Sequence, residues 1–108
     1  MPAQAVTWYQ RLGWCGTFFT ISCTLEYTGS WPDGQVRGLG QSDVYAVKLH
    51  TKTSATGSWV VAKATYPRQG GPVRTPATKV GKTNWYRVCV TPGIGGREGC
   101  GGSYYLGD

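Results

Sequence analysis

Residues 19–27, FTISCTLEY, alternate between apolar and polar side chains along their whole length. A period of two is the pattern of a β-strand, whose successive side chains point to opposite faces of a sheet. We therefore predict a strand with one buried and one solvent-facing side, as in an antiparallel sheet. The expected buried side chains are Phe19, Ile21, Cys23, Leu25 and Tyr27, and the expected solvent-facing ones are Thr20, Ser22, Thr24 and Glu26.

The same alternation recurs along the chain, between segments rich in glycine and proline. No segment carries apolar residues at helical spacing for three turns. Further strands are predicted at residues 5–10, 35–39, 43–51, 59–66, 84–91 and 103–106, with an edge strand near 78–80. We predict one all-β domain over residues 1–108, either a small antiparallel β-sandwich or a small barrel of about six to seven short strands.

Two short runs resemble immunoglobulin and fibronectin-type domains: TISC at residues 20–23 and YRVC at residues 86–89. An antibody-like tyrosine corner has its tyrosine two residues before the second cysteine, whereas Tyr86 stands three residues before Cys89. The resemblance therefore concerns architecture. It implies two packed antiparallel sheets and names no function.

The cysteine pattern indicates a disulfide framework. Four cysteines in a chain of 108 residues indicate two disulfides, an oxidising compartment and hence a secreted protein. The preferred arrangement joins sequence neighbours, Cys15–Cys23 and Cys89–Cys100, and each short loop would contribute ~2–3 kcal/mol. The rival joins Cys23 to Cys89 across two sheets and leaves Cys15 for Cys100. No C-x-x-C motif occurs and the single histidine, His50, is remote from every cysteine in sequence, so neither a metal site nor a cofactor is predicted.

The net charge of +6 comes from 11 basic and 5 acidic residues, and its distribution is uneven. No carboxylate occurs between Asp43 and Glu98. The basic residues of that stretch are Lys48, Lys52, Lys63, Arg68, Arg74, Lys79, Lys82, Arg87 and Arg97. Such asymmetry predicts a positive potential over much of the surface, which serves either solubility or an anionic partner. The sequence contains no run of about 18 apolar residues, so no transmembrane helix is predicted.

Few groups suit catalysis at neutral pH. His50 is predicted on the polar face of its strand, as an ordinary surface histidine. The five carboxylates show no spacing that predicts a facing pair: Glu26, Asp33, Asp43, Glu98 and Asp108. A small secreted ribonuclease needs a base, a histidine acid and an arginine for phosphate, for which the only candidates are His50, Glu26 or Glu98, and Arg87. Other catalytic motifs are absent, so we predict a protein that is not an enzyme.

Two tryptophans are predicted on the outward faces of their strands, Trp59 with Lys63 in one and Trp85 with Arg87 in the other. If these strands are neighbours, the four side chains form one aromatic–basic patch of the residue types enriched in interface hot spots. The alternative is that the outer face is also covered and the tryptophans are buried. Trp31, beside a Pro-Asp-Gly turn, is a second candidate contact, since loops on a β scaffold commonly carry recognition.

These features favour a secreted, non-enzymatic protein–protein interaction module, such as an adaptor or a component of an extracellular toxin or inhibitor assembly. The expected partner is another secreted or cell-surface protein with an acidic surface. One alternative is a carbohydrate-binding module with Trp and Tyr platforms, although Asn, Asp and Glu are scarce. Another is a basic antimicrobial or nucleic-acid-directed toxin, whose nucleic-acid binding would weaken steeply with salt.

Overall fold

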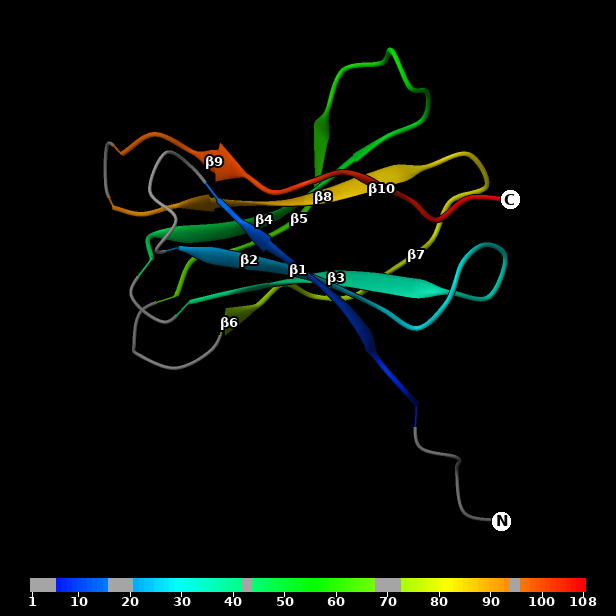
Figure 1. Ribbon diagram of the computed structural model, residues 1–108, viewed down its shortest axis with the longest axis horizontal. Helices are drawn as coiled ribbons and strands as arrows, with labels where there is room; N and C mark the ends of the chain where they lie inside the picture. The colour runs from blue at the N-terminus through cyan, green and yellow to red at the C-terminus, as the bar shows by residue number, and fades with distance from the viewer. Residues whose placement is uncertain (1–5, 16–20, 42–43, 68–72, 94–95) are drawn as a thin grey trace.

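The computed structural model describes residues 6–15, 21–41, 44–67, 73–93 and 96–108. Their strands form two antiparallel sheets that lie as two layers (Figure 1). This architecture confirms the predicted all-β sandwich. Within these ranges no helix has the length and apolar character needed to cross a membrane.

The first sheet is built around β2 (Ser22–Tyr27) and β3 (Gln35–Gly40). β1 (Tyr9–Trp14) pairs with β2 and forms one edge. On the other side of β3, two short strands pair with its two ends: β6 (Val73–Arg74) and β7 (Thr78–Lys79). The predicted edge strand near residues 78–80 is therefore confirmed, and β6 and β7, which lie between β5 and β8 in sequence, belong to the first sheet.

The second sheet is built around β4 (Ala46–Lys52) and β8 (Trp85–Thr91). β5 (Val60–Thr65) pairs with β4 at one edge. On the far side of β8 lie β10 (Tyr104–Tyr105) and β9 (Gly99–Cys100). The described residues thus hold six strands of six or seven residues, in line with the prediction, and four additional strands of two residues each.

The core lies between the sheets and is filled from the inward faces of β2, β3, β4 and β8. Tyr86, Val88 and Val90, which alternate along β8, are all buried there. β3 faces β4 at Gly40, where a Cβ would collide with the side chain of Val47. A glycine at that position therefore lets the two sheets pack at their observed distance.

Both disulfides join neighbours in sequence, which confirms the preferred pairing. Cys15–Cys23 connects the end of β1 to β2, and both cysteines are buried in the core. Cys89–Cys100 joins β8 to β9 as a directly opposed pair. The rival pairing is wrong because Cys23 faces the core from the first sheet, whereas Cys89 alternates with the inward side chains of β8 and points out of the second. Two disulfides fit an oxidising compartment.

Two predictions about the first strands need correction. The strand expected at residues 5–10 is observed at Tyr9–Trp14. Four residues of the predicted strands lie outside the described residues: residue 5, Phe19, Thr20 and Asp43. The polar face of β2 is not exposed to solvent: Thr24 and Glu26 are both buried. Side chains of the two flanking strands cover this face, so β2 is enclosed on both sides.

Candidate functional site

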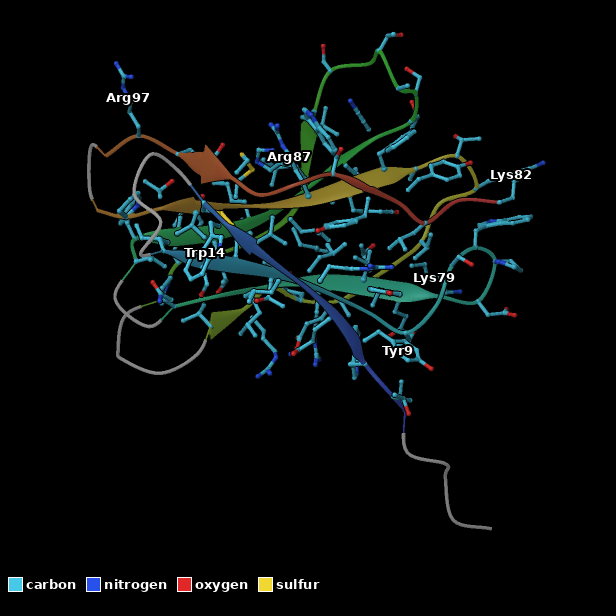
Figure 2. The ribbon with its side chains drawn as sticks, viewed as in Figure 1. Tyr9, Trp14, Lys79, Lys82, Arg87 and Arg97 are labelled. Carbon is cyan, nitrogen blue, oxygen red and sulfur yellow. A yellow bond between two sulfur atoms is a disulfide. The ribbon has the colours of Figure 1, made fainter. Side chains whose placement is uncertain are left out.

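The outer face of the second sheet carries the polar side chains of its two central strands, β4 and β8. Cross-strand partners project from the same face, and the residues between them along β4 and β8 point into the core. Three such pairs lie in successive rows: Lys48 with Cys89, His50 with Arg87, and Lys52 with Trp85. In Figure 2 Arg87 lies with the β8 layer, whereas Lys79 lies at the level of the other sheet.

Trp59, just before β5, lies across this face. Its ring is 4.4 Å from the guanidinium carbon of Arg87 and 4.6 Å from Nζ of Lys52, so two cations contact one indole. Beside it, the rings of Trp85 and Tyr105 are in contact, with centroids 4.9 Å apart. We call this the aromatic–basic surface: Lys52, Trp59, Trp85, Arg87 and Tyr105.

The structure brings three of the four predicted patch residues to this surface: Trp59, Trp85 and Arg87. Their strands are not neighbours, as the prediction assumed, because β4 lies between β5 and β8. It does not bring Lys63 there. The register shifts between Leu49 and His50, so that Lys63 pairs with Leu49, whose side chain is in the core. A β-bulge breaks the alternation of β5 and turns Lys63 to the opposite side from that predicted. Both Trp59 and Trp85 are half-buried, between the two alternatives that the sequence left open.

Lys52 belongs to the surface and was not predicted as a contact. The predicted strand at residues 43–51 ended one residue too early, and β4 extends to Lys52. The signal was present, because Lys48, His50 and Lys52 follow one another at a period of two.

Trp31 lies apart, in the loop between β2 and β3. Its amide N–H donates to the carbonyl of Leu106 over 2.8 Å, which holds this loop against the C-terminal segment. Lys82 lies 5.6 Å from the centre of its ring, and the tryptophan residue is 37% exposed. The structure therefore places this predicted contact at the end of the sandwich.

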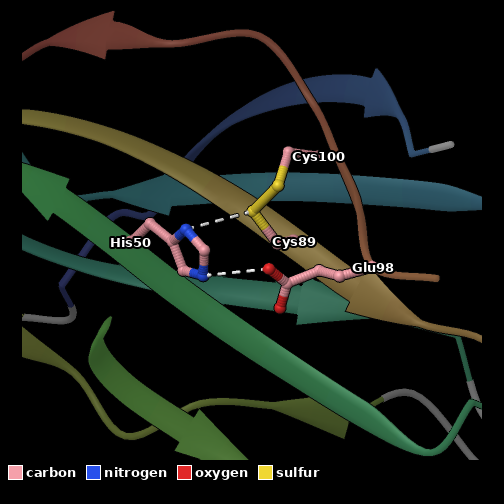
Figure 3. Close-up of side chains that lie close together, drawn as sticks. All are labelled: His50, Cys89, Glu98 and Cys100. Atoms are coloured by element: carbon pink, nitrogen blue, oxygen red, sulfur yellow. Dashed lines mark hydrogen bonds and ion pairs between the residues drawn. A yellow bond between two sulfur atoms is a disulfide. The ribbon is translucent and has the colours of Figure 1, made fainter. Parts of the chain in front are cut away.

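His50 is buried, in contrast to its predicted place on the surface. Only 6% of the residue is exposed. Nδ1 faces Nε and Nη2 of Arg87 at 3.4 and 3.3 Å, and Sγ of Cys89 lies 3.4 Å from the same nitrogen (Figure 3). A guanidinium has only donors, so Nδ1 acts as the acceptor and Nε2 carries the proton. The alternation of its strand predicts an exposed His50, but Arg87 and Cys89 of β8 and Glu98 just before β9 surround its ring.

Nε2 of His50 has no hydrogen-bond partner, although a carboxylate oxygen of Glu98 lies 3.5 Å away. The same carboxylate is 3.9 Å from Nζ of Lys48, and the Glu98 side chain is 32% exposed. Burial lowers the pKa of His50, and the Glu98 carboxylate opposes this effect. The positive charges of Arg87 and Lys48 lower the pKa further. The ring is therefore neutral at pH 7 and shielded from solvent.

A second carboxylate, Glu26, lies on the outer face of the first sheet. It accepts hydrogen bonds from Arg37 at 2.7 Å, Arg74 at 2.8 Å and Gln10 at 2.8 Å. Burial would raise the pKa of Glu26, but these hydrogen bonds lower it to about 2. The ring of Trp8 stacks on Arg37 at 3.7 Å and closes the network. Glu26 is thus a structural carboxylate, which His50 cannot reach from the other sheet.

Of the candidate ribonuclease residues, the structure assembles His50, Glu98 and Arg87 and excludes Glu26. Both ring nitrogens of His50 already face protein groups. Comparisons of the chain with protein-family models, with curated proteins and with solved structures find no match.

Proposed function

We propose that the chain is a secreted, non-enzymatic protein-interaction module that binds its partner through the aromatic–basic surface. The observation that carries the proposal is the single indole of Trp59 held between two cations, Arg87 and Lys52. The partner is a secreted or cell-surface protein that presents carboxylates next to apolar side chains.

The residue types of this surface support a protein partner. Trp, Tyr and Arg dominate the energetics of protein interfaces because they combine large apolar area with directed polar groups. The guanidinium of Arg87 is held between Trp59 and His50, so little side-chain entropy remains to be lost on binding. A preorganised cation on the same face as an exposed aromatic ring, Tyr105 at 41% exposure, suits an acidic group flanked by an apolar one.

The surroundings of His50 support a role without catalysis. A general acid or base must reach the proton that it transfers. His50 is buried, its Nδ1 accepts from Arg87, and its Nε2 points at Glu98. A substrate would have to displace one of these groups before the imidazole became available.

A protein partner also fits the local charge better than a nucleic acid does. Long cationic tracks bind phosphate backbones, and their affinity falls steeply with salt. On this face Glu98 lies close to Lys48, which leaves Lys52 and Arg87 as its main cations. Two cations among aromatic rings predict moderate salt dependence.

The test is an affinity capture of the oxidised protein from the secreted fraction of its source at low and high salt, with mass spectrometry of what is retained. Trp59→Ala and Arg87→Ala should each weaken the captured complex by about 2 kcal/mol, or roughly 30-fold, as hot-spot residues do. Trp14→Ala and Lys79→Ala are matched controls, because both residues lie in strands of the first sheet and are exposed.

We expect one protein to survive high salt and to be lost with the two surface variants but not with the controls. Retention of nucleic acid alone, or a glycan that binds equally at both salt concentrations, would overturn the proposal. Equal binding by all four variants would also overturn it. Chemical unfolding of each variant separates a lost contact from a lost fold.

A further inference from the structure

Four metal-ligating side chains meet at the edge of the aromatic–basic surface. A ring nitrogen of His50, Sγ of Cys89, Sγ of Cys100 and a carboxylate oxygen of Glu98 all lie within 4.8 Å of one another (Figure 3). Elsewhere in the described chain no other group of three or more such side chains lies this close. Thiolates bind metal ions, whereas the sulfurs of an intact disulfide are poor ligands. The cluster therefore gains its full donor set only in the reduced protein.

We propose that reduction of Cys89–Cys100 converts this corner into a Zn²⁺ site. A dithiol or phosphine reductant supplies two electrons, two protons are taken up, and the S–S bond becomes two thiols. Zn²⁺ then replaces the two thiol protons and is held by both thiolates and by Nδ1 of His50. The fourth position is open to water, because Cys100 is only partly buried and Glu98 is partly exposed.

One pair of ligand atoms already lies at the separation that a tetrahedral ion requires. Nδ1 of His50 lies 3.4 Å from Sγ of Cys89. With Zn–S of about 2.3 Å and Zn–N of about 2.0 Å, neighbouring ligand atoms of a tetrahedral site are roughly 3.5 Å apart. The histidine and the first sulfur therefore need almost no movement to share an ion.

The backbone keeps the second sulfur in place without the covalent bond. Cys100 pairs with Cys89 in the ladder between β9 and β8, and the N–H of Gly101 donates to the carbonyl of Val88 over 2.9 Å. After reduction these contacts hold Cys100 beside Cys89. The ion would then connect the two strands that the disulfide connects in the oxidised protein.

The buried, unpartnered Nε2 of His50 is the second observation that points to a metal. A histidine that binds metal through one nitrogen donates its other N–H to a carboxylate, which fixes the tautomer and strengthens the ligand. Nε2 lies 3.5 Å from a carboxylate oxygen of Glu98, the group that would accept this proton. Arg87 has to leave Nδ1, but its contacts of 3.3 and 3.4 Å are long, and its charge beside the thiolates favours their ionised form.

The other disulfide provides an internal control. Cys15 and Cys23 lie in the apolar core between the sheets, and among the described residues they belong to no such cluster. Two variants separate the pairs: Cys15→Ala/Cys23→Ala keeps the proposed ligands, and Cys89→Ala/Cys100→Ala removes them.

The experiment titrates each variant with Co²⁺ under a phosphine reductant, with Zn²⁺ displacement and circular dichroism in parallel. The variant that keeps Cys89 and Cys100 should bind one Co²⁺ and show thiolate-to-metal charge transfer with the intense visible bands of a tetrahedral ion. The variant without them should show neither, and no oxidised protein should bind. Affinity should fall by about 100-fold in His50→Ala and about 10-fold in Glu98→Gln.

If the double variants fail to fold when reduced, the comparison is made in the reduced wild-type chain, since His50→Ala and Glu98→Gln leave both cysteine pairs intact. Equal affinity of wild type and His50→Ala would overturn the proposal, and so would the absence of binding by a folded, reduced chain. The binding partner of the aromatic–basic surface plays no part in these measurements, so the two proposals can fail separately.

Discussion

Each outer face of the sandwich carries a glutamate beside basic side chains. The two glutamates differ in how many hydrogen bonds their carboxylate oxygens accept. Glu26 on the first sheet is 2% exposed and accepts hydrogen bonds from three side chains at 2.7 to 2.8 Å. Glu98 on the second sheet is 32% exposed, and its basic neighbours are 3.5 and 3.9 Å away. A saturated network holds its members in one arrangement, whereas groups with unused hydrogen-bonding capacity remain available to a ligand.

Trp8 on the first sheet and Trp59 on the second differ in the same way as the two glutamates. Trp8 stacks on Arg37, which is already bound to Glu26, so the stack closes a completed network. Trp59 lies between Lys52 and Arg87, for which no carboxylate partner is found among the described residues. The charges of the first face are therefore neutralised within the protein, whereas those of Lys52 and Arg87 are not, which supports the proposed binding role of the second face.

The largest expected difference is in stability at neutral pH. Glu26→Gln should lower the free energy of unfolding by about 3 kcal/mol, because it removes the charge that two arginines share in a buried site. Glu98→Gln should cost less than about 1 kcal/mol, as for a partly exposed ion pair. Urea unfolding of both variants measures the difference. Equal losses would erase the distinction between the two faces.

Low pH should destabilise the protein through the first face, as Glu26→Gln does, because it removes the charge of Glu26. The pKa of Glu26 is lowered from 4.5 to about 2 in the folded protein. Its contribution is therefore complete above pH 4.5 and is lost as the pH falls through about 2, a change of about 3 kcal/mol. Unfolding free energies measured between pH 5 and 2 should fall steeply for the wild type and less steeply for Glu26→Gln. Parallel curves for the two proteins would contradict this assignment.

The losses in unfolding free energy caused by Trp59→Ala and Trp14→Ala should differ by a smaller amount. Trp59→Ala should cost about 1–2 kcal/mol, because it removes two cation–π contacts and a half-buried ring. Trp14→Ala should cost about 0.5 kcal/mol or less, since Trp14 is 50% exposed on the edge strand of the first sheet. Thermal unfolding followed by circular dichroism makes this comparison, and it also calibrates the same two variants for the binding test.

The smallest expected effect is the titration of His50. Its folded pKa is lowered, so the unfolded chain takes up the proton first, and stability declines as the pH falls below 6.5. The effect should be weaker than for Glu26 because the Glu98 carboxylate opposes it. Unfolding between pH 7 and 5 should show a decline in the wild type that is absent from His50→Gln. If stability rose as the pH fell from 7 to 5, the Glu98 carboxylate would raise the pKa of His50 by more than burial lowers it.

Much of the fold was predictable because strand alternation is a local property. The buried residues of β8 and the strands around residues 35–39 and 103–106 follow from a period of two and from turn residues. The disulfide pairing was also predicted, since each pair closes a short loop between neighbouring strands. Alternation also predicted outward faces for Trp59, Trp85 and Arg87, but the assumed adjacency of their strands is wrong, because β4 lies between β5 and β8.

The sequence by itself determined the alternation of each strand, the cysteine framework and the basic, aromatic character of one surface. Only the tertiary structure decided which side chains meet across strands. The bulge beside His50 turns Lys63 to the other face, because one extra residue reverses every later side chain of an edge strand. The register of β4 against β8 brings His50 to Arg87 and Cys89, and the residue before β9, Glu98, reaches its other ring nitrogen. Contacts between residues so distant along the chain arise from strand order and register, which no local pattern of residues records.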